Sequence, residues 1–229
     1  LTEVSDRYKT IPWLIDTTNH VLVKKALEVL GIESYMPTLP ASVYKVKKLY
    51  VPVVPSFSKK VEIASKFLKE NSSKMNRDCI APRTKFGRGR VFLSRQGQKR
   101  RKILNWEAVK TTLDRYEIDI IRPEDYSIAQ MSEVLEKTDM VIAPNGAAVC
   151  NTLMCQQGVG DTKIIYPTTH LDDYYFRVTE AMGRRFAGIL NGRSALTQTT
   201  SELIESYYYP SIGDDYEIDV NSLEALIVA

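Results

Sequence analysis

The chain has 229 residues, of which 44% are hydrophobic, so it is long enough to bury a core as one large domain or as two small ones. Its formal net charge of +3 is too small to indicate a nucleic-acid or membrane partner by itself. Three cysteines without paired spacing form no disulfide framework, and Cys150 and Cys155 lack the clustered thiols or histidines of a zinc site. The chain has no apolar run of about eighteen residues, so we expect no transmembrane segment. It begins at Leu1, which leaves open that an N-terminal segment has been removed.

The first 85 residues predict a small α/β half. Residues 21–31 have the pattern of a helix capped by Asn19, residues 47–54 that of a strand, and residues 58–71 that of a second helix. A polar stretch without periodicity follows and is the expected boundary. This N-terminal half is too short for a complete Rossmann domain, so it is either reduced or the remainder of a larger one.

From residue 90 onward, short β-rich runs alternate with helical patterns, which predicts a Rossmann-like parallel sheet with helices on both faces. The expected strands are residues 90–94, 117–121, 139–143, 162–166 and 185–189. Asn105 is the expected cap of the first helix, and Ser127 and Gln130 have the spacing of a capping box at the start of the second. A third helix is expected to end near Gly183. The tail after residue 190 ends in a strand and a helix capped by Asn221, which we expect to pack back across both halves.

The turn after the strand at 139–143 is the first candidate site. Pro144, Asn145 and Gly146 stop the strand, and a helix of small residues follows. Ligands of a doubly wound sheet bind outside the carboxyl ends of its strands, where the first N–H groups of a helix can hold a diphosphate. The alternative is that the small residues serve only to let the helix pack closely on the sheet.

The second candidate is the basic stretch from Arg83 to Lys102, in which every charged residue is positive. Arg95 directly follows a strand and Arg101 precedes a helix, so we expect both guanidinium groups to bind the phosphates bidentately, without a metal ion. The other basic residues of this loop have the pattern of a solvated surface. An RNA-binding module is a weaker alternative, because the stretch lacks the interleaved aromatic residues that stack on bases.

Four segments, taken together, resemble glycosyltransferase family 61 in order and spacing. They are "LSRQGQKRRKILN", "IIRPEDYSIAQ", "TDMVIAPNGAAVCNTLMC" and "IIYP", and the N-terminal "PWLIDTTNHVLVKKALEVLGI" is also similar to the first half of that family. The resemblance implies a GT-B-like α/β architecture and an inverting, metal-independent transfer of a sugar from a nucleotide diphosphate, most simply a UDP-sugar. It implies three parts, an acceptor-side half (1–85), a nucleotide-sugar-binding domain (86–190) and a tail (191–229).

By position, the resemblance also implies roles for individual residues. Arg95 and Arg101 would face the diphosphate. Asn105 would hold their loop, and Gln130 would fix the preceding helix. Gly146 and Ala147 would offer backbone N–H groups, so that fixed dipoles stabilise the leaving nucleotide.

The sequence departs from the family pattern at three positions. Asn145 stands where many members have histidine, the motif near Pro12 lacks a histidine, and Ile164 stands where a glutamate is common. Asn145 can form hydrogen bonds but cannot donate a proton as imidazolium does. We expect Asp16 to be the catalytic base that takes the proton of the acceptor hydroxyl, with His20 as the second choice.

We therefore expect a glycosyltransferase of polysaccharide or glycan assembly, acting on a nucleotide-sugar donor and a glycan acceptor, with no nucleic-acid partner. The three departures motivate an alternative, a catalytically inactive member that binds a nucleotide sugar or a glycan. We expect a cytoplasmic location because the cysteines show no disulfide pattern, or the secretory lumen if the protein is eukaryotic.

Overall fold

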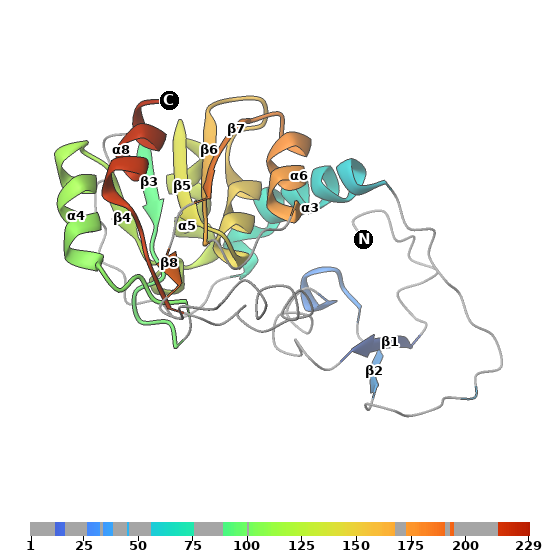
Figure 1. The fold of residues 1–229 in the computed structure, drawn as a ribbon. Helices are drawn as coiled ribbons and strands as arrows, with labels where there is room; N and C mark the ends of the chain where they lie inside the picture. The colour runs from blue at the N-terminus through green and yellow to red at the C-terminus, as the bar shows by residue number, and fades with distance from the viewer. Residues whose placement is uncertain are drawn as a thin grey trace.

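The computed structural model describes residues 12–16, 27–32, 34–38, 45, 56–75, 89–99, 101–167, 173–190, 193–194 and 215–229 (Figure 1). The expected strand at 47–54, the expected cap Asn19, and His20 lie outside these residues. The described residues include a five-stranded sheet with helices on both faces, which we call the sheet domain.

The sheet consists of β3 (Arg90–Leu93), β4 (Asp119–Ile121), β5 (Met140–Pro144), β6 (Asp161–Tyr166) and β7 (Arg185–Leu190). The strand order is β4-β3-β5-β6-β7, and every neighbouring pair is parallel. This confirms the five expected strands and the parallel sheet. The strand expected from residue 117 begins two residues later, because Glu117 has a φ of 56° and ends the preceding helix in a left-handed turn.

The three central strands, β3, β5 and β6, are buried on both faces over most of their length. Side chains of one strand alternate between two cores: Val91 and Leu93 belong to one cluster, and Phe92 between them belongs to the other. The helices α5 (Ile128–Glu136) and η4 (Ala147–Met154) cover the first core. The helices α4 (Trp106–Arg115) and α8 (Val220–Val228) cover the second.

The helix starts agree in part with the predictions. The capping box at α5 is confirmed, since Ser127 Oγ accepts from the Gln130 N–H and Gln130 Oε1 accepts from the Ser127 N–H. Asn105 stands at the cap position of α4, but its side chain forms no capping hydrogen bond there. The cap of α8 is Asp219, whose carboxylate accepts from the Ser222 N–H; the prediction of Asn221 was wrong because Val220 is already helical.

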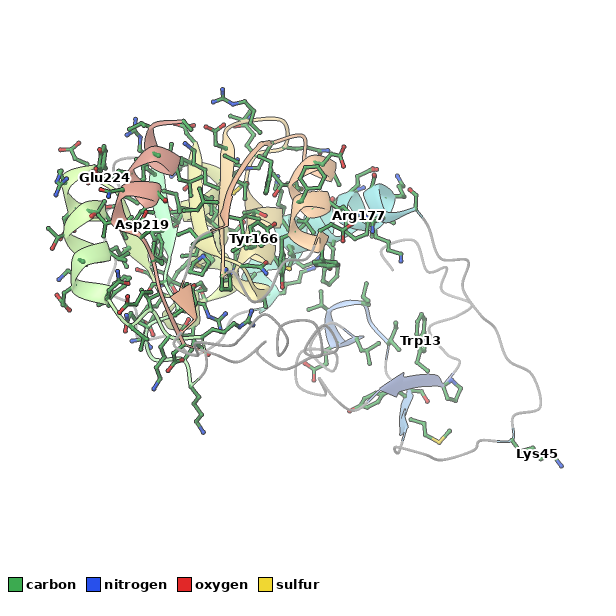
Figure 2. All side chains as sticks on the ribbon, viewed as in Figure 1. Trp13, Lys45, Tyr166, Arg177, Asp219 and Glu224 are labelled. Carbon is green, nitrogen blue, oxygen red and sulfur yellow. The ribbon has the colours of Figure 1, made fainter. Side chains whose placement is uncertain are left out.

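Helix α3 (Phe57–Asn71) packs on the sheet domain, although the sequence analysis assigned it to the N-terminal half. Val61 joins a cluster with Val178 and Met182 of α6 (Tyr174–Ala181), and Ser65 Oγ donates to the Leu153 carbonyl in η4 at 2.7 Å. Figure 2 labels Arg177 where α6 meets α3, and its guanidinium lies 4.4 Å from the Phe57 ring centroid. A short 3₁₀-helix, η2 (Ser72–Met75), continues α3.

In the N-terminal part, β1 (Trp13–Asp16) and β2 (Tyr35–Thr38) form a parallel pair. The helical residues 27–29 end where the sequence predicted, since Gly31 has a φ of 68° and the Ile32 N–H donates to the Leu27 carbonyl.

The C-terminal part contains β9 (Tyr216–Glu217), which pairs antiparallel with β8 (Arg193–Ser194) and leads into α8. We expected this tail to pack across both halves; its described residues pack on the sheet domain, on the face that α4 also covers.

Candidate phosphate site at the sheet edge

The strand order reverses at β3, and this point determines where the site lies. The chain passes from β3 to β4 on one side, then returns to β5 on the other side of β3. In open parallel sheets, ligands bind outside the carboxyl ends of the two strands between which the chain reverses. Arg95 follows β3 shortly after its end, and Asn145 and Gly146 directly follow β5, so both predicted motifs lie at this point.

The turn after β5 is built from buried backbone. The Asn145 N–H donates to the Ile165 carbonyl at 2.8 Å, which extends the pairing with β6, and Asn145 is 1% exposed. Gly146 has a φ of 151° and a ψ of −179°, a conformation that side chains rarely allow. The helix of small residues that follows is the 3₁₀-helix η4.

The first amide groups after the turn are candidate donors to a ligand. The Val149 N–H donates to the Gly146 carbonyl, but no hydrogen bond joins the N–H groups of Gly146, Ala147 or Ala148 to another described residue. Ala147 is exposed, so this end of η4 faces the solvent. Successive free N–H groups at a helix start favour an anion, although a short 3₁₀-helix has a weaker dipole than an α-helix.

Arg95 and Arg101 converge on Gly146. A Cβ atom placed on Gly146 would lie 3.0 Å from Nη1 of Arg95 and 3.3 Å from Nη1 of Arg101. Arg101 Nη1 also donates to the Asn145 carbonyl at 3.0 Å, and Arg101 has a left-handed backbone, with a φ of 56°. Two guanidinium groups thus meet over one glycine.

The close approach of the Arg95 and Arg101 guanidinium groups favours a bound anion. Burial is the main cause that lowers the pKa of Arg95, and the positive charge of Arg101 lowers it further. The pKa of Arg95 is raised, in contrast, by Tyr216, Glu124 and Tyr175. Glu124 is also engaged elsewhere: it accepts a hydrogen bond from Gln98 at 2.8 Å. An anion between the two guanidinium groups would relieve their repulsion and form charge-assisted hydrogen bonds with both.

Asn105 and Gln130, to which the resemblance gave supporting roles, form hydrogen bonds away from the two arginines. Asn105 forms a two-way bond with the Ile218 backbone: Nδ2 donates to the carbonyl at 2.7 Å, and Oδ1 accepts from the N–H at 3.0 Å. Gln130 belongs to the capping box of α5. Asn105 therefore fastens the loop after Arg101 to the C-terminus, and Gln130 fixes the start of a helix.

The remaining residues singled out from the sequence lie at the first strand, β1, and in the core of the sheet domain. Asp16 is the last residue of β1, and its role stays a prediction. Pro12 is exposed just before that strand. Ile164 is fully buried in the core beneath α5 and η4, so this position presents no side chain at the site.

The sequence analysis missed Tyr216 and Tyr175, which both act to raise the pKa of Arg95. The Tyr216 N–H also donates to the carbonyl of Lys102, the residue after Arg101. Tyr175 lies in the first turn of α6, which follows the carboxyl end of β6 and therefore begins at the same sheet edge. No motif marks Tyr216, because its proximity depends on the return of a distant segment.

Among the described residues, no group of three or more histidine, cysteine or acidic side chains could hold a metal ion. None of the described helices is long and apolar enough to cross a membrane.

A family model described as Glycosyltransferase 61 matches residues 7–165, which is more than half of the chain. The match includes the two arginines and the turn at Gly146, and it ends inside β6. No curated protein matches the chain at a significant level.

Proposed function

Because the chain belongs to glycosyltransferase family 61 and is thus a glycosyltransferase, we propose that its donor is a nucleotide-diphosphate sugar whose diphosphate binds at the carboxyl ends of β3 and β5. The observation that carries this proposal is the convergence of Arg95 and Arg101 on Gly146. Two guanidinium forks and the N–H groups that follow the turn match the oxygens of a diphosphate.

These groups would act most strongly as the glycosidic bond to the donor phosphate breaks. The negative charge that develops on the leaving diphosphate would fall between the two guanidinium groups and the dipoles of the turn. The guanidinium groups supply the charge that a metal ion supplies in other transferases, so we propose that the transfer needs no metal ion. UDP-sugars are the donors to test first.

The acceptor, a glycan or polysaccharide, is proposed to bind between the sheet domain and the N-terminal half, in a GT-B-like arrangement. Asp16 is the proposed base: it would take the proton of the acceptor hydroxyl as that oxygen attacks the anomeric carbon and inverts it. Its place at the carboxyl end of a parallel strand, where ligands of α/β proteins bind, supports this role.

A thermal-shift panel of nucleoside diphosphates and sugar nucleotides, with and without magnesium, tests the donor site. A ligand that binds only the folded state stabilises it by about 2.7 kcal/mol at a concentration of 100 times its Kd. We expect one family of diphosphates to raise the Tm equally with and without magnesium. In Arg95→Ala the affinity should fall at least about tenfold, the expected loss of one charge-assisted pair.

Arg185→Ala is the matched control. Arg185 is an exposed arginine at the amino end of β7, on the opposite edge of the sheet, where it pairs with Asp161 at 2.6 Å. The Arg185→Ala variant should show the same rise in Tm with nucleoside diphosphates as the wild type. The donor site is contradicted if no diphosphate raises the Tm of the wild type. It is also contradicted if Arg95→Ala and Arg185→Ala lose this rise in Tm equally. Binding without sugar transfer would instead identify an inactive member of the family.

A further inference from the structure

The C-terminal segment, residues 215–229, is fastened to the loop that carries Arg101. The Tyr216 N–H donates to the Lys102 carbonyl at 2.9 Å, and the Leu104 N–H donates to the Tyr216 carbonyl at 2.8 Å. Asp215 Oδ1 accepts from the Lys102 N–H at 2.8 Å. Together with the bond between Asn105 and Ile218, these contacts fix the backbone just after Arg101. Figure 1 shows the segment in red running beside the green loop.

The segment lies outside residues 7–165, which the family model matches. It nevertheless determines the conformation next to one of the two arginines. Figure 2 labels Asp219 and Glu224 on it, and Glu224 pairs with Arg115 of α4 at 2.6 Å, so the segment is held along its length. A segment fixed in this way can place a side chain at the site as firmly as a strand of the sheet does.

Tyr216 is the side chain that it places there. The residue is 1% exposed, and its hydroxyl is buried without a hydrogen-bond partner among the described residues. The hydrogen bonds of its backbone with Lys102 and Leu104 hold Tyr216 beside the loop that carries Arg101. Burial raises the pKa of Tyr216, while Arg95 and Arg101 act to lower it, in agreement with this position. A buried hydroxyl that lacks a partner destabilises the folded state, so its retention calls for an explanation.

We propose that Tyr216 is a positioning residue of the diphosphate site, whose hydroxyl oxygen accepts a guanidinium hydrogen bond when Arg95 and Arg101 turn toward a bound diphosphate. This inference rests on the proposed function. Each guanidinium has five N–H donors, so the use of two on a phosphate leaves three, and the phenol oxygen would accept from one of these. A bond formed only in the liganded state adds its free energy to binding and none to folding.

The test is Tyr216→Phe in the full chain, with UDP and inorganic pyrophosphate as probes in calorimetric titrations. We expect the Kd of both probes to rise by about tenfold, the effect of losing one hydrogen bond to a charged group. The loss should be equal for the two probes, because pyrophosphate has the phosphates but neither base nor sugar. The Tm without ligand should stay the same or rise, since the variant removes a buried hydroxyl that has no hydrogen-bond partner among the described residues.

Tyr116→Phe is the matched control. Tyr116 is half-buried at the end of α4 and packs against the same core cluster as Tyr216. Because this end of α4 leads to the amino end of β4, the substitution removes a hydroxyl at the sheet edge opposite the site. Its Kd values should equal those of the wild type.

Unchanged affinity in Tyr216→Phe, with normal binding by the wild type, overturns this inference and leaves the donor site intact. A Tm that falls in Tyr216→Phe also overturns it, because the hydroxyl would then serve folding. Failure of the wild type to bind both UDP and pyrophosphate would instead overturn the proposed function itself.

Discussion

Gly146 is the residue on which the site depends most directly. Its backbone conformation is accessible to glycine and strained for other residues, and the space that a side chain would fill holds two guanidinium groups. The sequence could indicate that a glycine was required after β5. It could not indicate that the space above the glycine belongs to Arg95 and Arg101, which come from a different loop.

Gly146→Ala should therefore impair both folding and binding. We expect a loss of about 1–3 kcal/mol in stability from backbone strain. UDP affinity should fall at least about tenfold, because the new Cβ displaces guanidinium groups from the phosphate position. Denaturant unfolding and UDP titration measure the two effects.

Gly158→Ala is the control for strain alone. Gly158 has a φ of 73°, and a Cβ there would meet no atom within 4 Å. It lies before β6, at the amino edge of the sheet. This variant should lose stability but keep UDP affinity; an equal loss of affinity in both variants would mean that Gly146 acts only through folding.

At the scale of single elements, local sequence rules succeeded where every partner is near in the chain. The capping box of α5 joins residues three apart, so its pattern is sufficient to predict it. The start of α8 was misplaced by two residues because both Asp219 and Asn221 are good caps. The first turn after Gly146 became a 3₁₀-helix, which small residues by themselves do not distinguish from an α-helix.

Asp219→Ala should destabilise the protein by about 1 kcal/mol, the usual contribution of an N-cap. Its carboxylate accepts from both the N–H and the hydroxyl of Ser222, at 3.1 and 2.7 Å. Asn221→Ala, two positions away on the exposed side of α8, should change the free energy of unfolding by less than about 0.5 kcal/mol. Urea unfolding measures the free energy of unfolding of both variants. A larger loss in Asn221→Ala than in Asp219→Ala would identify Asn221 as the cap.

At the scale of the whole molecule, the position of α3 is the main difference from the expected organisation. Helix α3 precedes the polar stretch that was taken as a boundary, yet Val61 and Ser65 contact α6 and η4. Composition marks a polar connection, but it does not show on which side of that connection a helix packs. The division of the chain into three parts stays a prediction, with α3 now attached to the sheet domain.

Val61→Ala should lower the stability of the sheet domain by on the order of 2 kcal/mol, because it opens a cavity between α3 and α6. The chain has two tryptophans, so a Trp13→Phe background leaves Trp106 on α4 as the only tryptophan, whose emission can be excited selectively. Trp106 lies against the opposite core of the sheet, and it should report the lower midpoint of unfolding if α3 belongs to that cooperative unit.

Val228→Ala is the matched control, since Val228 is 69% exposed and should contribute little. An unchanged Trp106 transition in Val61→Ala would mean that α3 unfolds independently of the sheet.

The sequence by itself determined the parallel sheet, the helices between its strands and the candidate phosphate ligands after β3 and β5. Each of these follows from hydrophobic periodicity or from residue types a few positions apart. Only the tertiary structure decided that both arginines meet over Gly146, that Asn105 binds Ile218 across 113 positions, and that Tyr216 lies beside the site. Such contacts depend on how distant segments pack, and no local pattern carries that information.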